Sequence, residues 1–538
     1  MNWKSLLGAT LGLAMVVPTA ALAGGYELPE NGARAVGRAG ANFAHVDDAS
    51  ATYFNPAGLS RVNGLDINFS VNLPLYFASF QRDPHIYRLS GDDFDSVVNY
   101  ERETNQLRVF PAPMFFIAHN FGIEDFAAGF GIYGPSAVPE ARWRGADPNA
   151  AVPGAPTVLD PTRNEVTRAG GNAYQVVDSS LLTIYPSLTV AARIPNTTLR
   201  IGGAIQLVYV DTNVTVSLDG SGAIDGRDAI AYDPSTNTGF TSSENPGFYA
   251  PSGIASSGFG ITGNFGIQWD IIPQLTFGLN YRPRHLVRTS GNVVLDLPEA
   301  LNTDSTRVVL ADDSARIDVV FPHVLRGGIN YRHLDQTGFE VFDLELAFTW
   351  EAWSTVPSFR VRAPGPASEV GTGSFTNRTI PPIEIPVRFQ NSFSLRLGGD
   401  INALVNRETG NGLTLRGGIL YESASSPNEY TNLLFTAFQR IGVSVGASYQ
   451  INRWGIDLGA MYLHSPTRQV TDGDFRIQMP LWVCNDPASH GSAGLTAGQV
   501  AAACQNNRAE GLDPRHAVNN GEYRVSYLIL STGVRYQW

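Results

Sequence analysis

The sequence predicts an all-β fold, a 14-stranded antiparallel transmembrane β-barrel with a small helical or irregular N-terminal hatch inside its lumen. Three observations lead to this prediction. Segments in which apolar and polar residues alternate recur fourteen times along the chain. The connections between these segments are alternately short and long. The first alternating segment follows a stretch that does not alternate, residues 24–62.

The last segment, residues 522–538, shows the alternation most clearly. Side chains of a strand point to opposite faces with period two. One face of this segment is apolar (Leu528, Leu530, Val534, Tyr536 and Trp538), and the other is small or polar (Ser531, Gly533, Arg535 and Gln537). An apolar outer face that ends on an aromatic residue suits a lipid-facing strand, since aromatic side chains line the membrane–water interface.

The other segments repeat this pattern. In chain order, the segments before the last are 65–73, 107–120, 126–133, 182–193, 199–207, 259–270, 275–281, 324–331, 342–350, 393–400, 413–422, 441–449 and 454–462. A tilted barrel strand needs about nine to eleven residues to cross the hydrocarbon region. Most segments approach that length, and many end on Tyr or Trp, as interfacial girdles require.

The connections alternate in length along the chain. The short ones are residues 121–125, 195–198, 271–273, 332–338, 401–412 and 452–453, while the long ones include 134–179, 212–256 and 465–521. Barrels of bacterial outer membranes have short periplasmic turns and long extracellular loops. Six short and seven long connections therefore predict fourteen strands with both termini on the periplasmic side. A soluble β-sandwich has no reason to sort its loops in this way.

The N-terminus has the pattern of a secretory signal. Lys4 precedes an apolar stretch, residues 6–17, and then Ala21-Leu22-Ala23. We expect cleavage after Ala23. A single membrane anchor is the alternative, but the apolar run is shorter than the roughly 20 residues of a spanning helix. The expected organisation is signal peptide 1–23, hatch 24–62 and barrel 63–538.

Composition agrees with a barrel in the bacterial outer membrane. Charged residues make up 16% of the chain, whereas soluble domains carry about a quarter. The net charge of −12 argues against nucleic acid as a partner.

The predicted inner faces carry charges and glycines. The charges are Asp343, Glu345, Arg396, Arg416 and Glu422. One explanation of these inward charges is ordinary hydration and ion pairing in the lumen. The other is a site that binds the carboxylate of a substrate. The glycines leave room inside the barrel or permit curvature; they are Gly202, Gly266, Gly278, Gly328, Gly398, Gly418, Gly446 and Gly459. A lumen of fourteen strands is too wide for wall side chains alone to fill. We therefore expect residues 24–62 to fill it.

Three motifs in this N-terminal stretch carry a family resemblance: Gly37-Arg38-Ala39-Gly40, Asp47-Asp48-Ala49-Ser50 and Asn55-Pro56-Ala57-Gly58-Leu59. Together they resemble the hatch of the FadL-type (FadL/TodX) outer-membrane transporters of long-chain fatty acids and hydrocarbons. Further matches follow in order at Gly131-Ile132-Tyr133-Gly134-Pro135, Trp143-Arg144-Gly145 and Trp353-Ser354.

The resemblance implies passive uptake of fatty acids or similar hydrophobic molecules. The substrate would be captured at the cell surface, bind beside the hatch and leave sideways through an opening in strand three. Gly129, Gly131, Gly134 and Pro135 fit such an opening, since glycine weakens strand pairing and proline donates no ladder hydrogen bond. Candidate substrate-binding residues are Tyr26, Phe54, Arg396 and Arg416. Outer-membrane lipid and lipopolysaccharide are the expected surroundings of a monomer.

Other chemistries have little support in the sequence. Cys484 and Cys504 lie in one long extracellular connection, where an oxidising compartment favours a disulfide over free thiols. We expect no metal and no cofactor. No nucleophile, base and orienting residue assemble into a catalytic motif, so we expect no enzyme. A general porin and, more remotely, a barrel enzyme acting on lipid are the alternatives to the transporter.

Overall fold

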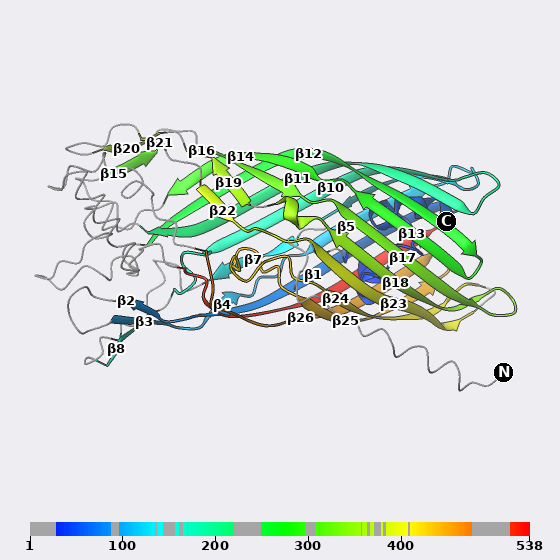
Figure 1. Ribbon diagram of the computed structural model, residues 1–538. Helices are drawn as coiled ribbons and strands as arrows, with labels where there is room; N and C mark the ends of the chain where they lie inside the picture. The colour runs from blue at the N-terminus through cyan, green and yellow to red at the C-terminus, as the bar shows by residue number, and fades with distance from the viewer. Residues whose placement is uncertain are drawn as a thin grey trace, which may run out of the picture.

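A computed structural model of the chain describes residues 28, 30–87, 96–134, 137–143, 157–160, 165–168, 170–219, 249–295, 307–310, 313–356, 358–362, 366–370, 378–379, 383–406, 409–475 and 517–538. These residues form a long closed antiparallel barrel with short turns at one end and long connections at the other (Figure 1). No helix in the described part of the chain is long and apolar enough to cross a membrane.

The barrel wall has fourteen strands, as predicted. Seven of them are single elements: β1 (Leu65–Arg82), β10 (Asp178–Arg193), β11 (Leu199–Asp219), β12 (Tyr249–Ile272), β24 (Gly412–Glu422), β25 (Arg440–Ile451) and β26 (Trp454–Val470). The last strand, β27 (Gly521–Gln537), pairs with β1 from Asp66↔Gln537 to Arg82↔Gly521 and closes the barrel.

The six remaining strands are each built from two pieces. They are β4 (Glu103–Gln106) with β5 (Ala112–His119), β6 (Phe126–Tyr133) with β7 (Ala137–Trp143), β13 (Leu275–Arg282) with β14 (His285–Leu295), β16 (Ser314–Phe321) with β17 (Val324–Leu334), β18 (Glu340–Glu351) with β19 (Ser358–Arg362), and β22 (Ile383–Pro386) with β23 (Ser392–Val405). Pro283 and Pro322 stand at two of these breaks, where the missing N–H interrupts the ladder.

All six predicted short turns join consecutive strands at one end of the barrel. At the other end the strands continue beyond the predicted segments; β12, for example, begins at Tyr249 rather than near Phe259. Alternation marks only the part of a strand that faces lipid on one side, and the protruding ends lose it. Two small sheets lie among the long connections: β2 (His85–Tyr87), β3 (Ser96–Tyr100), β9 (Glu165–Arg168) and β8 (Thr157–Asp160); and β15 (Arg307–Leu310), β20 (Pro366–Val370) and β21 (Arg378–Thr379).

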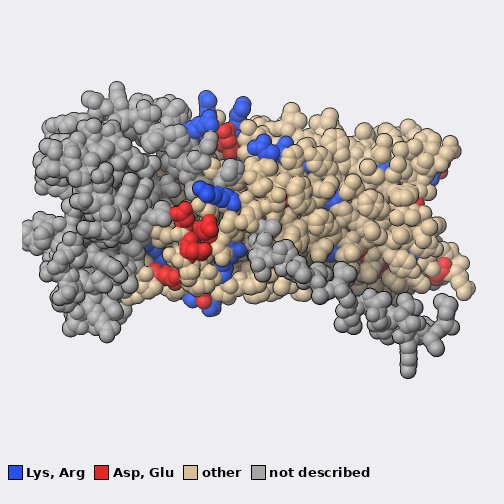
Figure 2. Space-filling model, viewed as in Figure 1, with Lys and Arg blue, Asp and Glu red and all other residues tan. Residues whose placement is uncertain are grey.

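The outer wall is apolar. Ile205 and Ile261 are each 72% exposed on neighbouring strands. On the face shown in Figure 2, the charged side chains gather where the long connections leave the barrel and are sparse over the rest of the wall. Such a belt is what a barrel needs in contact with lipid.

Residues 30–62 fill the lumen at the end with the short turns (Figure 1). They form α1 (Ala33–Gly37), α2 (Ala51–Phe54) and the 3₁₀ helix η2 (Pro56–Arg61). Nearly all their side chains are buried, from Val36 to Leu59. We call residues 30–62 the hatch from here on. These helices are only four to six residues long, too short to be stable alone, so contacts with the barrel must hold them.

Candidate functional site: a hatch, a cavity and a gap in the wall

The inward glycines form the seat of the hatch. A Cβ atom added at any of the eight would meet hatch atoms: at Gly202 the Pro56 carbonyl carbon at 2.4 Å, at Gly278 the Phe43 oxygen at 2.5 Å, and at Gly459 the Ala33 oxygen at 2.6 Å. The other five face hatch atoms in the same way (Gly266, Gly328, Gly398, Gly418 and Gly446). Of the two roles expected for these glycines, the structure therefore supports making room inside the lumen.

Arg38 is the main ionic link between hatch and wall. Its guanidinium is fully buried, donates to Asp343 at 2.9 Å and to Asp400 at 2.5 Å, and also donates to the Ala41 carbonyl at 2.9 Å. The two carboxylates come from neighbouring strands, β18 and β23. Burying a charge costs several kcal/mol unless partners satisfy it, so this arrangement fixes the hatch against that part of the wall.

Glu345 anchors the next part of the hatch through backbone groups. Its carboxylate accepts from the N–H groups of Phe43 at 2.6 Å, Ala44 at 3.0 Å and His45 at 3.2 Å. Three consecutive N–H groups around one carboxylate are an anion-binding arrangement of the backbone. This contact could not be predicted from the sequence, because the hatch contributes only backbone N–H groups to it.

Arg396 and Arg416 lie in ion pairs beneath the hatch. Arg396 pairs with Glu30 of the hatch and with Glu422, and Arg416 pairs with Asp400 at 3.0 Å and Asp457 at 3.4 Å. Both arginines are buried. Between the two explanations of these lumen charges, the geometry favours ion pairing that holds the hatch over a free site for a substrate carboxylate.

Asn55 fixes the turn between α2 and η2. Its side-chain oxygen accepts from the Ala57 N–H at 3.2 Å and caps η2, while its amide donates to the carbonyls of Phe43 and Ile267, both at 2.9 Å. Pro56 occupies the first position of η2, where its missing N–H costs nothing. A Cβ atom at Gly58 would lie 2.3 Å from the Val46 oxygen. The Asn-Pro-Ala-Gly motif therefore allows a turn that packs against both hatch and wall.

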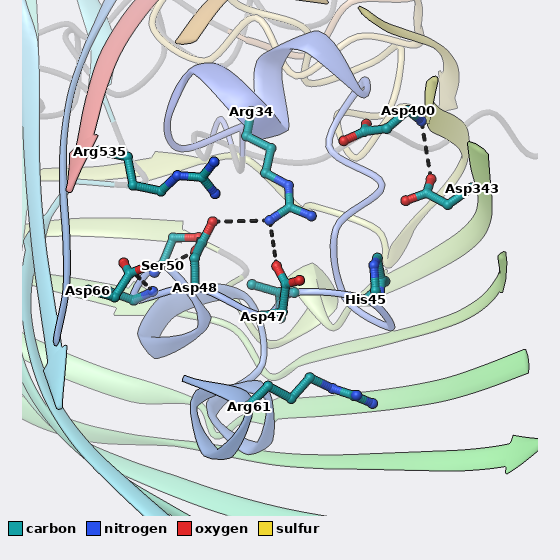
Figure 3. Close-up of polar contacts among 12 residues, drawn as sticks. Arg34, His45, Asp47, Asp48, Ser50, Arg61, Asp66, Asp343, Asp400 and Arg535 are labelled. Atoms are coloured by element: carbon teal, nitrogen blue, oxygen red, sulfur yellow. Dashed lines mark hydrogen bonds and ion pairs between the residues drawn. The ribbon is translucent and has the colours of Figure 1, made fainter. Parts of the chain in front are cut away.

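The acidic motif of the hatch pairs within the hatch itself. Arg34 of α1 donates to Asp47 at 2.7 Å and to Asp48 at 3.1 Å (Figure 3). Desolvation would raise the pKa of Asp47, but the Arg34 guanidinium outweighs it and holds that pKa well below its usual range. Arg34 therefore ties α1 to the loop before α2.

Phe54 belongs to an aromatic cluster between hatch and wall. Its ring centroid lies 4.8 Å from that of Tyr53, which in turn lies 5.0 Å from Tyr133 at the end of β6. Tyr133 stacks at 6.0 Å on Tyr185 of β10. These rings lead from the hatch along the inner wall. Tyr26, the other aromatic candidate, lies outside the described residues, as do Pro135, Cys484 and Cys504.

An apolar cavity lies further along the barrel than the aromatic cluster, in the half with the long connections. Its walls include Leu181, Val214 and Val319 from the strands, together with Leu434 and Phe435. The last two belong to residues 423–439, the connection between β24 and β25, which we call the inward loop. The cavity has a volume of about 60 Å³, whereas sites for drug-sized ligands measure about 300–1,000 Å³. A larger guest would have to displace side chains of the inward loop.

The inward loop is held by hydrogen bonds deep in the barrel. Its Leu433 N–H donates to Gln175 at 3.0 Å, its Thr431 carbonyl accepts from Asn519 at 2.8 Å, and its Ser426 carbonyl accepts from Arg468 at 2.9 Å. Leu433, Leu434 and Phe438 are buried. The lumen is therefore filled from both ends, with the cavity between the two fillings.

The hydrogen-bonded wall is interrupted between the second and third strands. The ladder between β5 and β6 ends at Phe115↔Ile132, and the ladder between β4 and β7 begins at Gln106↔Arg142. Between these points Leu107–Pro111 form no strand, and the third strand breaks after Tyr133, at Gly134. β10 pairs with β6 as far as Tyr133 and with β7 from Ala137 onward. The gap therefore opens toward the second strand.

Gly129 and Gly131 play a different part from Gly134. Both lie inside β6 and are paired on each side, with Ala118 and Thr189 and with Phe116 and Ser187 respectively. An added Cβ atom would lie 3.0 Å from Leu59 at Gly129 and 3.1 Å from Thr52 at Gly131. These two glycines make room for the hatch, whereas the break in pairing begins at Gly134.

Comparison with known proteins agrees with this architecture. The model of one protein family, outer membrane protein transport protein (OMPP1/FadL/TodX), matches residues 157–502. No curated protein matches the chain. Among solved structures, a FadL homologue of Pseudomonas aeruginosa is similar with a TM-score of 0.63 at 15% identity, covering 96% of this chain and 100% of the other.

Two toluene transporters have the same fold. TbuX of Ralstonia pickettii matches with a TM-score of 0.54 at 14% identity, over 95% of this chain and 99% of its own. TodX of P. putida matches with a TM-score of 0.53 at 12% identity, over 95% and 99%. Barrel, hatch and family model agree: the chain belongs to the OMPP1/FadL/TodX family of outer-membrane transport proteins for hydrophobic molecules.

Proposed function

We propose that this protein mediates passive uptake of long-chain fatty acids or similar hydrophobic molecules, and that they leave the barrel sideways through the gap between its second and third strands. The observation that carries the proposal is the gap itself, since it lies beside Tyr133, which contacts the hatch residue Tyr53, and beside β10, which lines the cavity. A filled lumen disfavours the alternative of a general porin. A barrel enzyme acting on lipid would have to release chemically altered products.

The cavity and the gap share one strand of the wall. Leu181 of β10 lines the cavity, and Tyr185, four residues further along the same face, pairs with Tyr133 at the edge of the gap. Four residues of strand span roughly 13 Å. A long-chain fatty acid is longer than this distance, so a molecule in the cavity could reach the opening along a wall that carries an apolar side chain and then aromatic rings.

The energetics favour release into the membrane. Each methylene group moved from water to an apolar environment gains about 0.8 kcal/mol, so release of a long chain into the periplasm is strongly opposed. The segment across the gap is itself apolar on its outer side, with Leu107 51% and Val109 60% exposed. A lateral exit keeps the hydrophobic part of the substrate away from water throughout.

Blocking the gap chemically should stop uptake. We expect that Val109→Cys, labelled with a bulky maleimide in a background with Ser at positions 484 and 504, lowers fatty-acid uptake at least tenfold. The matched control is Leu188→Cys, which is 67% exposed on the outer face of β10 within fully paired wall. The measurement is uptake of a radiolabelled fatty acid by cells before and after labelling. Equal uptake by labelled Val109→Cys and labelled Leu188→Cys would show that the lateral route is wrong.

A further inference from the structure

A histidine of the hatch and two carboxylates of the wall converge at the end of the barrel with the short turns. His45 lies in the hatch between α1 and α2, and Glu340 and Asp343 lie at the start of β18. One ligand atom from each of the three residues lies within 4.8 Å of the other two. Figure 3 shows His45 beside Asp343 across the seam between hatch and wall. His45 lies 295 or more positions before Glu340 and Asp343 in the sequence, so no short motif reveals the three residues as a group.

The distance between His45 and Glu340 suits two ligands of one ion. The imidazole Nε2 lies 3.5 Å from a Glu340 carboxylate oxygen, which is long for a hydrogen bond between charged groups. Ligand atoms at about 2.0–2.2 Å from a tetrahedral Zn²⁺ ion are roughly 3.4 Å apart. Asp343 offers the third ligand atom, which lies within 4.8 Å of the other two.

The histidine also has an unsatisfied group. His45 is 6% exposed, and its Nδ1 atom has no hydrogen-bond partner among the described residues. Buried polar atoms normally find a partner. The described side chains therefore leave hydrogen-bonding capacity on the His45 ring unused, and its orientation is not fixed by a second contact.

The charges around the histidine leave an excess of acid. The ion pairs at this seam involve seven carboxylates (Asp47, Asp48, Glu340, Asp343, Glu345, Asp400 and Asp457) against three arginines (Arg34, Arg38 and Arg416). Asp343 already accepts from Arg38, but Arg38 is shared with Asp400 and lies 3.9 Å from Glu345. Asp343 accepts from Arg38 through both of its oxygens and from the Asp400 N–H at 3.2 Å. A carboxylate has about four lone-pair sites, so one remains for a metal ion.

We propose that His45, Glu340 and Asp343 form a binding site for one divalent transition-metal ion of the Zn²⁺ class. Imidazole nitrogen with two carboxylate oxygens is a donor set that Zn²⁺ accepts, with water in the fourth position. The Glu340 side chain is 25% exposed, so that water and the entering ion reach the site from the periplasmic side. The ion joins the hatch to β18 and adds a link that the Arg38 and Glu345 contacts do not supply.

The test uses the full-length mature protein, purified in detergent, stripped with a chelator and titrated with Zn²⁺ in a calorimeter. We expect one saturable site per chain, at least tenfold weaker in His45→Gln and in Glu340→Gln. His333→Gln is the matched control, because His333 lies at the same end of the barrel but is exposed on its outer side; its affinity should equal that of the wild type. Folding of each variant is checked by the heat-dependent gel mobility of the barrel.

The visible absorption of bound Co²⁺ is a second measurement. It would not change if the three residues only stabilised the fold. Tetrahedral Co²⁺ absorbs strongly in the visible range, and the band should appear with the wild type and the control variant but not with His45→Gln or Glu340→Gln. Unchanged affinity and an unchanged Co²⁺ band in these two folded variants would overturn the site, as would the lack of any saturable binding to the wild type. Neither result bears on the proposed lateral route, which is argued from the gap and the cavity.

Discussion

Replacing Gly418 with Val should displace the hatch and open the lumen to ions. A Cβ atom at this position would lie 2.6 Å from the Arg38 carbonyl carbon and 2.9 Å from the Ala39 Cβ, and the wall cannot retreat because β24 is paired on both sides. The hatch has no core of its own to keep it folded outside its seat. We therefore expect single-channel conductance to rise clearly above its near-zero value, but to stay below that of an empty barrel because the inward loop remains in place.

The neighbouring residue provides the control. Gly417 faces outward, and its nearest atom to an added Cβ is the Ser444 oxygen at 3.9 Å, an ordinary contact. Gly417→Val changes the same strand by the same side chain and should leave conductance near zero. If Gly418→Val conducts no more than Gly417→Val in a planar bilayer, the hatch does not close the lumen in the way that we describe.

Removing the Arg38 guanidinium should weaken the hatch by about 3–5 kcal/mol. Arg38→Leu leaves Asp343 and Asp400 buried without their cation, and breaking a buried ion pair on one side costs about that much. Hydrogen exchange of the hatch amides measures the effect, because opening of the hatch exposes them. A loss of 3–5 kcal/mol corresponds to exchange faster by about 100-fold to more than 1,000-fold.

The control for Arg38→Leu is an exposed pair of the same kind. Arg102 donates to Glu522 at 2.8 Å, with the two side chains 37% and 26% exposed. Such surface pairs contribute about 0–1 kcal/mol, so Arg102→Leu should leave hatch exchange unchanged. Equal exchange rates in the two variants would contradict the role of Arg38 as the main ionic link.

The barrel could be predicted because lipid imposes a repeated pattern. In every strand that crosses the membrane, apolar residues that face lipid must alternate with residues that face the lumen. Ile205 on β11 and Trp538 are examples of the exposed apolar residues. The protruding ends of β11 and β12 were missed because neither face touches lipid there. Splits such as that at Pro283 were missed because the alternation changes phase there. Even-numbered residues such as Asn280 and Arg282 face inward before the break, and odd-numbered ones such as His285 do so after it.

The hatch was predicted from its lack of alternation, from the width of the lumen and from the family resemblance, but its contacts were not. Arg38 stood out as part of a motif, whereas Glu345 and Glu30 became meaningful only when the fold brought them to the hatch. The inward glycines did carry a usable signal, since small residues on an inner face leave space for something else. Arg396 and Arg416 were named as candidate substrate ligands beside the alternative of ion pairing, because a sequence shows charge but not the partner that neutralises it.

The most direct test of the transport account is uptake of a radiolabelled long-chain fatty acid by cells that lack their own uptake protein and produce this one. We expect uptake well above that of cells without the protein, with the label recovered as unaltered fatty acid and with no increased entry of a small water-soluble solute such as a labelled sugar. Entry of the sugar without uptake of the fatty acid would contradict the account and indicate an open pore.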